Sequence, residues 1–341
     1  MSDTGGLRVF GDADGDMSHL SGHSIAVLGY GNQGRTQALN LRDSGVEGIV
    51  IGTLRDESWA NAEADGFAPR SVADAAEAGD ILFLLVPDEE LPEVFAEHIE
   101  AHLKPNDTLV FATGYNLAFG EMTPPKNVDL IMLAPRMIGQ KARELFERGE
   151  GFYSYVSVEQ NASGRAWPTL LALAKGIGTL RAGAFEVSAR DEAVLDLFAE
   201  QGWGAVVGST IMLMLDVATK AGLPPEALIL DTYFSGEMAE TFEAMAELGF
   251  YEQSRLHSRT SQYGGMMRTI AMDREPIRKH LETVLAEIQS GAFAKQWAEE
   301  RANGCENFER LRELGRQANP FTPIEERIRA AVREARGRRE A

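Results

Sequence analysis

Three glycines at fixed spacing are the first residues of this 341-residue chain whose pattern indicates chemistry. Gly29, Gly31 and Gly34 form a G-x-G-x-x-G motif between an apolar run and an amphipathic one. Between a strand and a helix, the first glycine of such a motif permits a tight turn. The second lets backbone N–H groups approach a pyrophosphate, and the third lets helix and strand pack closely. We therefore predict a dinucleotide site formed by Gly29, Tyr30, Gly31, Asn32, Gln33 and Gly34.

The choice of dinucleotide depends on residues 53–58, about 20 positions beyond the motif, where the ribose of such a cofactor is bound. Arg55 and Ser58 could hold the 2′-phosphate of NADP. Asp56 and Glu57 would repel that phosphate and could accept hydrogen bonds from the free ribose diol of NAD. The two acids favour NAD, and NADP held by Arg55 remains the alternative.

A pair of acids indicates a second kind of chemistry. Asp196 and Glu200 lie four residues apart in a run of helical periodicity, so their carboxylates are predicted on one helix face. Like charges at this spacing destabilise an isolated helix by roughly a few tenths of a kcal/mol, and a bound cation would remove that cost. Oxygen ligands suit Mg²⁺. A solvent-exposed pair is the alternative, and Asp231 and Glu237 add carboxylates in a later helical segment.

The elements that must position these residues form two different patterns. In the first half, short apolar runs typical of buried parallel strands occupy residues 24–29, 48–52, 81–86, 108–112 and 130–134. Residues 33–44 have one apolar face and end before Gly45, as expected for a crossover helix. A strand at 153–158 and a helix at 166–175 extend this α/β pattern, which we expect to end near residue 187.

Helical periodicity replaces the alternation from residue 191 onward. The predicted helices span 191–202, 209–221, 225–248, 274–290, 291–304 and 323–336. The most apolar stretch, 205–215, is too short to span a bilayer and is predicted to be a buried helix. The sequence therefore predicts an α/β domain with a parallel sheet at 1–187, followed by an all-α domain at 188–341.

Composition limits the classes of partner. The formal net charge of −19 argues against nucleic acid and membrane surfaces, because both are negatively charged. A hydrophobic fraction of 44% and a charged fraction of 25% are ordinary for a globular protein. The single cysteine, Cys305, cannot form an intrachain disulfide, and no apolar signal segment opens the chain. The expected location is the cytoplasm, and the expected partner is a small-molecule substrate.

The chain resembles ketol-acid reductoisomerases from about Leu7 to Ala330. The segments that carry the resemblance are VLGYGNQGRTQALNLRDSGV at 27–46, VPDEELPEVF at 86–95, LAKGIGTLRAG at 173–183, DLFAEQ at 196–201, and Ser258 with Thr260 before Gln262-Tyr263-Gly264. This resemblance implies a Rossmann domain followed by a knotted helical domain. It also implies a homodimer in which each active site takes helical residues from the neighbouring subunit.

The resemblance also assigns metal ligands. Asp196 and Glu200 match the family's first two Mg²⁺ ligands, and Asp231 falls where the partner subunit supplies a third. The spacing of the fourth ligand lands on Ser235, whereas alignment from the downstream side places Glu237 at that position. An insertion in this segment therefore leaves the fourth ligand open between the two residues.

Two family motifs are altered. The motif His-Gly-Phe-Asn becomes Thr113-Gly114-Tyr115-Asn116, which removes an imidazole beside the nicotinamide. The motif Pro-Lys-Gly-Pro-Gly becomes Pro135-Arg136-Met137-Ile138-Gly139, which replaces a point charge by a planar guanidinium and adds apolar bulk. Ser258 matches the serine that holds the substrate carboxylate. The catalytic candidates are Thr113, Arg136, Asp196, Glu200, Glu237 and Ser258, and Val86, Pro87 and Gly114 join the cofactor-binding set with Arg55, Asp56 and Ser58.

The altered motifs bear on the reaction. The family uses Mg²⁺ and a nicotinamide to rearrange and reduce an α-hydroxy ketone. With Thr113 and Arg136 in place, we expect action on a small α-hydroxy ketone or vicinal diol in specialised metabolism, including cyclopropanol formation from a sulfonium-bearing diol. The alternatives are the authentic branched-chain enzyme, a metal-free β-hydroxyacid dehydrogenase or imine reductase, and a nicotinamide-binding regulatory module.

Overall fold

The predicted apolar runs all form strands of one sheet. A computed structural model describes residues 6–317 and 319–337, and contacts divide the chain into two units, Met1–Asp196 and Leu197–Ala341. This division falls inside a helix, and the predicted boundary near residue 187 stays a prediction. The strands of the first unit are β1 (Val9–Phe10), β2 (Ile25–Leu28), β3 (Ile49–Gly52), β4 (Ile81–Leu84), β5 (Thr108–Phe111), β6 (Asp129–Pro135), β7 (Ser154–Gln160) and β8 (Ala184–Glu186).

The sheet has the order β1-β8-β7-β6-β5-β4-β2-β3 and is mostly parallel. The prediction of a parallel sheet holds from β3 to β6, but β7 runs antiparallel to β6, and β1 runs antiparallel to β8. The chain leaves β6 at Pro135 and starts β7 at Ser154, and these two residues are paired. Because the connection begins and ends at the same edge of the sheet, the two strands must be antiparallel.

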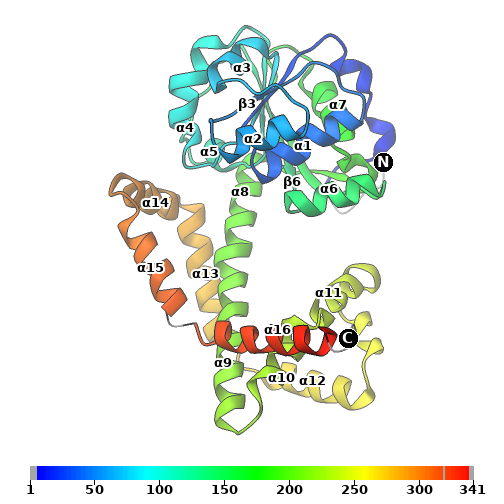
Figure 1. Ribbon diagram of the computed structural model, residues 1–341, viewed down its shortest axis with the longest axis vertical. Coiled ribbons are helices and arrows are strands. Elements are labelled where there is room, and N and C mark those ends of the chain that lie inside the picture. Colours follow the sequence, from blue (N-terminus) through cyan, green and yellow to red (C-terminus); the bar gives the residue numbers. More distant parts are fainter. Residues whose placement is uncertain (1–5, 318, 338–341) are drawn as a thin grey trace. The chain divides into compact units, whose positions relative to one another are not determined.

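Alternate strand residues point to opposite faces, so a strand covered on both faces must be apolar throughout. Ile25 and Val27 belong to one core cluster, whereas Ala26 and Leu28 belong to another. The helices that contribute to the first cluster are α1 (Asn32–Asp43), α2 (Glu57–Ala64), α6 (Gly139–Glu147) and α7 (Ala166–Ile177). The helices of the second are α3 (Val72–Ala78), α4 (Leu91–Val94) and the π-helical segment η3 (Phe95–Ile99). This is a Rossmann-type arrangement with helices on both faces of the sheet (Figure 1).

The strand order places a crevice at the carboxyl ends of β2 and β4. From β2 the chain passes to β3 on one side, whereas β4 pairs with β2 on the other side. Ligands of open α/β sheets bind at such a switch point, because the loops after the two strands diverge there. The glycine motif follows β2, and Val86 and Pro87 follow β4.

The second unit is helical, as predicted. Its helices are α9 (Gly204–Lys220), α10 (Pro225–Ile229), α11 (Glu237–Leu248), α12 (Arg259–Ala271), α13 (Glu275–Gln289), α14 (Ala292–Ala302), α15 (Glu306–Gln317) and α16 (Phe321–Gly337). The single helix predicted at 225–248 is wrong, because a π-helical segment η7 (Leu230–Phe234) and Gly236 at φ 88° separate α10 from α11. Helices α12 and α15 were not predicted from periodicity.

The apolar stretch 205–215 differs from its prediction. Within the chain by itself only Leu215 of this stretch is buried, and Met212, Leu213 and Met214 are exposed. The continuous helical run Ala189–Lys220 is also long and apolar enough to span a bilayer by length and composition, although core helices of soluble proteins pass the same test. The expectation of a buried helix is therefore wrong for the isolated chain.

Candidate active site

Each motif glycine has a different reason for lacking a side chain. Gly29 has φ 98°, and a Cβ there would lie 2.4 Å from the carbonyl oxygen of Leu85. A Cβ on Gly34 would lie 2.0 Å from the carbonyl oxygen of Gly29, so helix α1 packs directly on the turn. A Cβ on Gly31 would meet no described atom within 4 Å. Gly29 and Gly34 are thus required by the protein itself, whereas the space at Gly31 fits a bound pyrophosphate.

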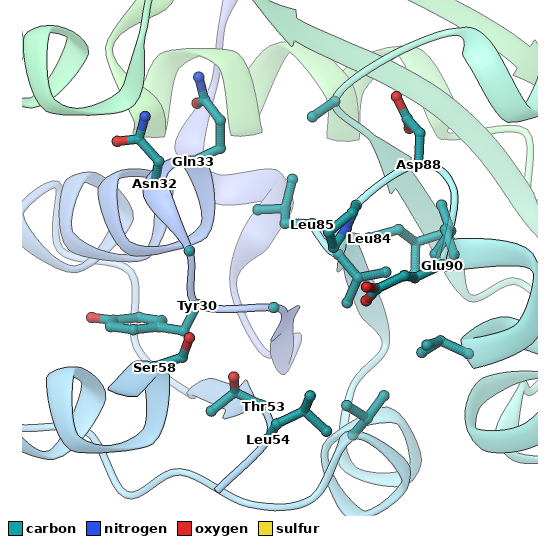
Figure 2. Close-up of a pocket in the computed structure, with 18 of the residues that line it drawn as sticks. Tyr30, Asn32, Gln33, Thr53, Leu54, Ser58, Leu84, Leu85, Asp88 and Glu90 are labelled. Carbon is teal, nitrogen blue, oxygen red and sulfur yellow. The ribbon is translucent and has the colours of Figure 1, made fainter. Parts of the chain in front are cut away.

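A cavity of about 630 Å³ lies beside this turn. Figure 2 shows the residues that line it, from the turn after β2 and from the loops after β3 and β4. The predicted residues that line it are Gly29, Tyr30, Gly31, Asn32, Gln33, Asp56, Ser58, Val86, Pro87 and Thr113. Of the other cofactor candidates in the described chain, Gly34 packs under the turn, Gly114 lies beyond the lining, and Arg55 lines an adjacent hollow.

The predicted ribose end of the cavity is formed by the start of helix α2. The Oδ1 atom of Asp56 accepts a hydrogen bond from the backbone N–H of Ser58 at 2.8 Å and caps the helix. The guanidinium of Arg55 lies 4.5 Å from the ring centroid of Trp59. A carboxylate therefore occupies the helix N terminus, the position at which an anion such as a 2′-phosphate would be stabilised.

The opposite end of the cavity contains Asp88, which the sequence analysis did not select. The hydroxyl of Thr113 donates to Asp88 Oδ1 at 2.8 Å, and the amide of Asn116 donates to the Asp88 backbone carbonyl at 3.1 Å. Burial raises the pKa of Asp88 to about 6, against the lowering effect of the Thr113 hydrogen bond. Asp88 directly follows Val86 and Pro87 at the end of a predicted strand, and this position could have identified it from the sequence.

Arg136 connects two acids of helix α8 (Ala189–Phe198). Its guanidinium donates to Glu192 Oε1 at 3.0 Å and to Asp196 Oδ1 at 2.5 Å, and it lies 5.0 Å from the ring centroid of Tyr155. The backbone N–H of Gly114 donates to Glu192 Oε2 at 2.6 Å. Burial raises the pKa of Glu192 to about 7, and the nearby charge of Asp196 adds to that rise. Glu192 was not among the predicted site residues, although it lies four residues before Asp196 and extends the same spacing.

Comparison with known proteins assigns this architecture to a family. Residues 19–183 match the model described as "Acetohydroxy acid isomeroreductase, NADPH-binding domain". Residues 190–334 match "Ketol-acid reductoisomerase, C-terminal domain". The chain belongs to the ketol-acid reductoisomerase family.

Individual relatives match this chain over most of their length. The ketol-acid reductoisomerase (NADP(+)) of Pseudarthrobacter chlorophenolicus is 37% identical over 320 residues, which are 94% of this chain and 92% of that protein. The corresponding protein of Sulfurisphaera tokodaii is 39% identical over 302 residues, or 87% and 90% of the two chains. An NADH-preferring ketol-acid reductoisomerase from an uncultured archaeon has a TM-score of 0.86 at 32% identity, covering 95% of this chain and 98% of its own. The predicted resemblance is confirmed, and the chain is an NAD(P)-dependent enzyme of the ketol-acid reductoisomerase type.

The four residues predicted to bind metal lie in different segments. Asp196 is held by Arg136, whereas Glu200 is exposed in the π-helical segment η6 (Ala199–Trp203). Asp231 is exposed in η7, and Glu237 is the first residue of α11. Within residues 6–317 and 319–337, no three His, Cys, Asp or Glu side chains are grouped so as to hold a metal ion. The four-ligand set therefore stays a prediction.

The serine predicted to bind the substrate caps a helix. Ser258 is the N-cap of α12, where its hydroxyl accepts a hydrogen bond from the backbone N–H of Ser261 at 3.2 Å. It lies in the second unit, and its assignment to substrate binding stays a prediction. A side chain at a helix N terminus has backbone N–H groups beside it, and these are suited to bind a carboxylate.

The glycine geometry predicts different effects for two single substitutions. Gly31→Ala should leave the free energy of unfolding within about 1 kcal/mol of the original, because its backbone at φ −78° suits any residue. The same substitution should weaken NADH binding about tenfold or more, a change of ~1.4 kcal/mol, because the new methyl group occupies the pyrophosphate space. Urea unfolding and calorimetric titration measure the two quantities.

Gly34→Ala serves as the matched comparison. Its methyl group would overlap the Gly29 carbonyl, so we expect a loss of about 1–3 kcal/mol in unfolding free energy. Unweakened NADH binding by Gly31→Ala would contradict the placement of the cofactor in this cavity.

Proposed function

We propose that this enzyme uses NAD(H) and Mg²⁺ to act on a small α-hydroxy ketone or vicinal diol, as a ketol-acid reductoisomerase diverted to specialised metabolism. The observation that carries the proposal is the bridge from Arg136 to Glu192 and Asp196. Arginine stands here where the family motif has lysine, and Thr113 stands where it has histidine. Both changes fall on side chains that the ordinary reaction uses.

The two replacements remove proton donors that titrate. A guanidinium stays protonated at all physiological pH values, whereas an ammonium or an imidazole can give up its proton. Two carboxyl groups of this region have raised pKa values, Asp88 at about 6 and Glu192 at about 7. Proton transfer would therefore depend on carboxyl groups, which changes the chemistry that this pocket can assist.

The surroundings of Arg136 are acidic, and this bears on the substrate. Glu192 and Asp196 both contact its guanidinium, and the charge of Asp88 contributes to the raised pKa of Glu192. Acidic surroundings favour a cationic substrate, because complementary charge attracts and selects it. A sulfonium-bearing diol would fit this charge, with cyclopropanol formation as the reaction. The authentic branched-chain enzyme remains the alternative, supported by the full-length family match.

Magnesium is part of the proposal. Asp196 and Glu200 supply oxygen donors, the ligand type that Mg²⁺ prefers. The bound ion would supply Lewis-acid polarisation of the substrate oxygens. Asp231 and Glu237 would reach the site from a second copy of the chain. The exposed apolar side chains of Met212, Leu213 and Met214 in α9, and of Met266, Met267 and Ile270 in α12, support such a homodimer. The cytoplasm stays the predicted location.

The ribose end supports NAD(H) as the preferred cofactor. We expect NADH to bind about tenfold or more tightly than NADPH, because Asp56 places a negative charge at the helix N terminus. Asp56→Ala should raise the affinity for NADPH, with a loss of about 1 kcal/mol of stability from the missing cap. Glu63→Ala removes the same charge from the far end of α2 and should leave the ratio unchanged. Calorimetric titration with both cofactors measures this ratio, and a preference of the unmodified protein for NADPH would overturn the NAD(H) assignment.

Metal removal tests the Mg²⁺ assignment. EDTA should abolish turnover, and added Mg²⁺ should restore it, because the substrate oxygens need the ion. Asp196→Asn should abolish Mg²⁺-dependent turnover while NADH affinity changes by less than about threefold, since the carboxylate does not line the cofactor cavity. Full activity in EDTA would instead favour a metal-free β-hydroxyacid dehydrogenase or imine reductase.

Turnover of 2-acetolactate separates the diverted enzyme from the authentic one. General acid–base assistance is worth roughly 10² to 10⁴-fold, so we expect turnover at least about a hundredfold below that of an ordinary family member. Thr113→His combined with Arg136→Lys should recover part of the rate, and Arg148→Lys, an exposed control on α6's C-cap, should not. An unmodified rate of roughly 1 to 10³ per second would establish the branched-chain reaction instead.

A further inference from the structure

Asp65 is the C-cap of helix α2, and it accepts hydrogen bonds from the glycine turn and from helix α1. Its Oδ2 atom accepts from the Tyr30 hydroxyl at 3.0 Å and from Arg35 Nε at 2.6 Å, and its Oδ1 accepts from Arg35 Nη2 at 2.9 Å. Its backbone carbonyl accepts from Arg42 Nη1 at 2.6 Å. Tyr30 belongs to the glycine turn, and both arginines belong to α1. The end of α2 is therefore tied to the turn and to the helix that follows it.

Tyr30 stands between two motif glycines, yet its side chain does not face the cofactor space. The residue is only 2% exposed, and its ring packs edge-on against Phe67 with centroids 5.9 Å apart. Figure 2 shows the ring pointing away from Leu85 and Asp88, on the far side of the cavity. The backbone of Tyr30 thus borders the cavity while its hydroxyl serves as an anchor to Asp65.

The interactions of Asp65 are stronger than those of an ordinary surface ion pair. Its side chain is 14% exposed, and the two-point contact with Arg35 holds the pKa of this carboxyl below its usual value. Charge-assisted, bidentate hydrogen bonds of this kind are stronger and more directional than neutral ones. The guanidinium of Arg42 also lies 5.2 Å from the Phe67 ring centroid, so a cation–π contact reinforces the same junction.

We propose that Asp65 is a positioning residue for the cofactor, because it fixes the start of α2 relative to the glycine turn. The helix carries Asp56 and Ser58 at one end and Asp65 at the other, so holding one end of this short rigid element holds both. A dinucleotide contacts the turn with its pyrophosphate and the helix start with its ribose. A site whose two halves are already fixed loses less entropy on binding. This inference concerns cofactor binding and does not depend on the proposed substrate.

Asp65→Asn in the full-length protein tests the proposal. The amide cannot accept both guanidinium hydrogen bonds of Arg35, so the junction loosens although no residue that lines the cavity is replaced. We expect NADH and ADP, which both span pyrophosphate and ribose, to bind about tenfold more weakly in calorimetric titration, or ~1.4 kcal/mol. The kcat at saturating NADH should stay within about twofold, because only binding is affected. Tyr30→Phe should weaken both ligands about threefold, since the Arg35 pair remains.

Asp43→Asn is the matched control. Asp43 pairs with Arg143, which ties α1 to α6, and with Arg42 of its own helix. Arg42 meets Asp43 through Nε, whereas it donates to the Asp65 carbonyl through Nη1, so Asp43→Asn removes no hydrogen bond to α2. Asp43→Asn should lower the thermal stability about as much as Asp65→Asn does, but it should leave the affinities for NADH and ADP unchanged. The proposal is overturned if Asp65→Asn binds both ligands like the unmodified protein, or if Asp43→Asn weakens them equally. If Asp65→Asn does not fold, unchanged affinity in Tyr30→Phe overturns it.

Discussion

A buried carboxylate sets the geometry at the carboxyl edge of the sheet. Glu192 is 1% exposed, and a charged group is tolerated at such a position only when it is paired. It accepts one hydrogen bond from the backbone of Gly114 and another from the guanidinium of Arg136. The loop after β5, the end of β6 and the start of α8 therefore converge on one group. Asp196 shares the same arginine, so its position is fixed by this constraint as well.

Much of the fold could be predicted from the sequence because its signals are local. The central strands are apolar at every position, since α1 and α7 cover one face of the sheet and α3 covers the other. Strands β1 and β8 are only two and three residues long and leave too little pattern to detect. The direction of β7 depends on its pairing with β6, which no local pattern encodes. Gly236 breaks a helical period that continues on both sides of it.

Only part of the candidate site could be predicted, because some of its residues are identified by local pattern and others only by distant partners. The glycine turn could be found because its requirements belong to neighbouring residues, and the structure gives Gly29 and Gly34 separate steric causes. Asp88 and Glu192 gain significance only through partners distant in the sequence, such as Thr113 and Gly114. The burial that raises their pKa values to about 6 and about 7 likewise exists only in the folded chain. The metal-ligand assignments of Asp196, Glu200, Asp231 and Glu237 stay predictions.

The two π-helical segments have a consequence for how this chain is compared with its relatives. Glu200 lies in η6, and Asp231 lies in η7. A π turn closes its hydrogen bond one residue later than an α turn, so one extra amino acid can be stored in a helix without displacing the helix ends. Evolution can thus insert a residue there while both flanking turns keep their places. Counting forward from Asp231 gives Ser235 and counting back from Tyr263-Gly264 gives Glu237, and one residue stored in η7 would account for one of the two positions between them.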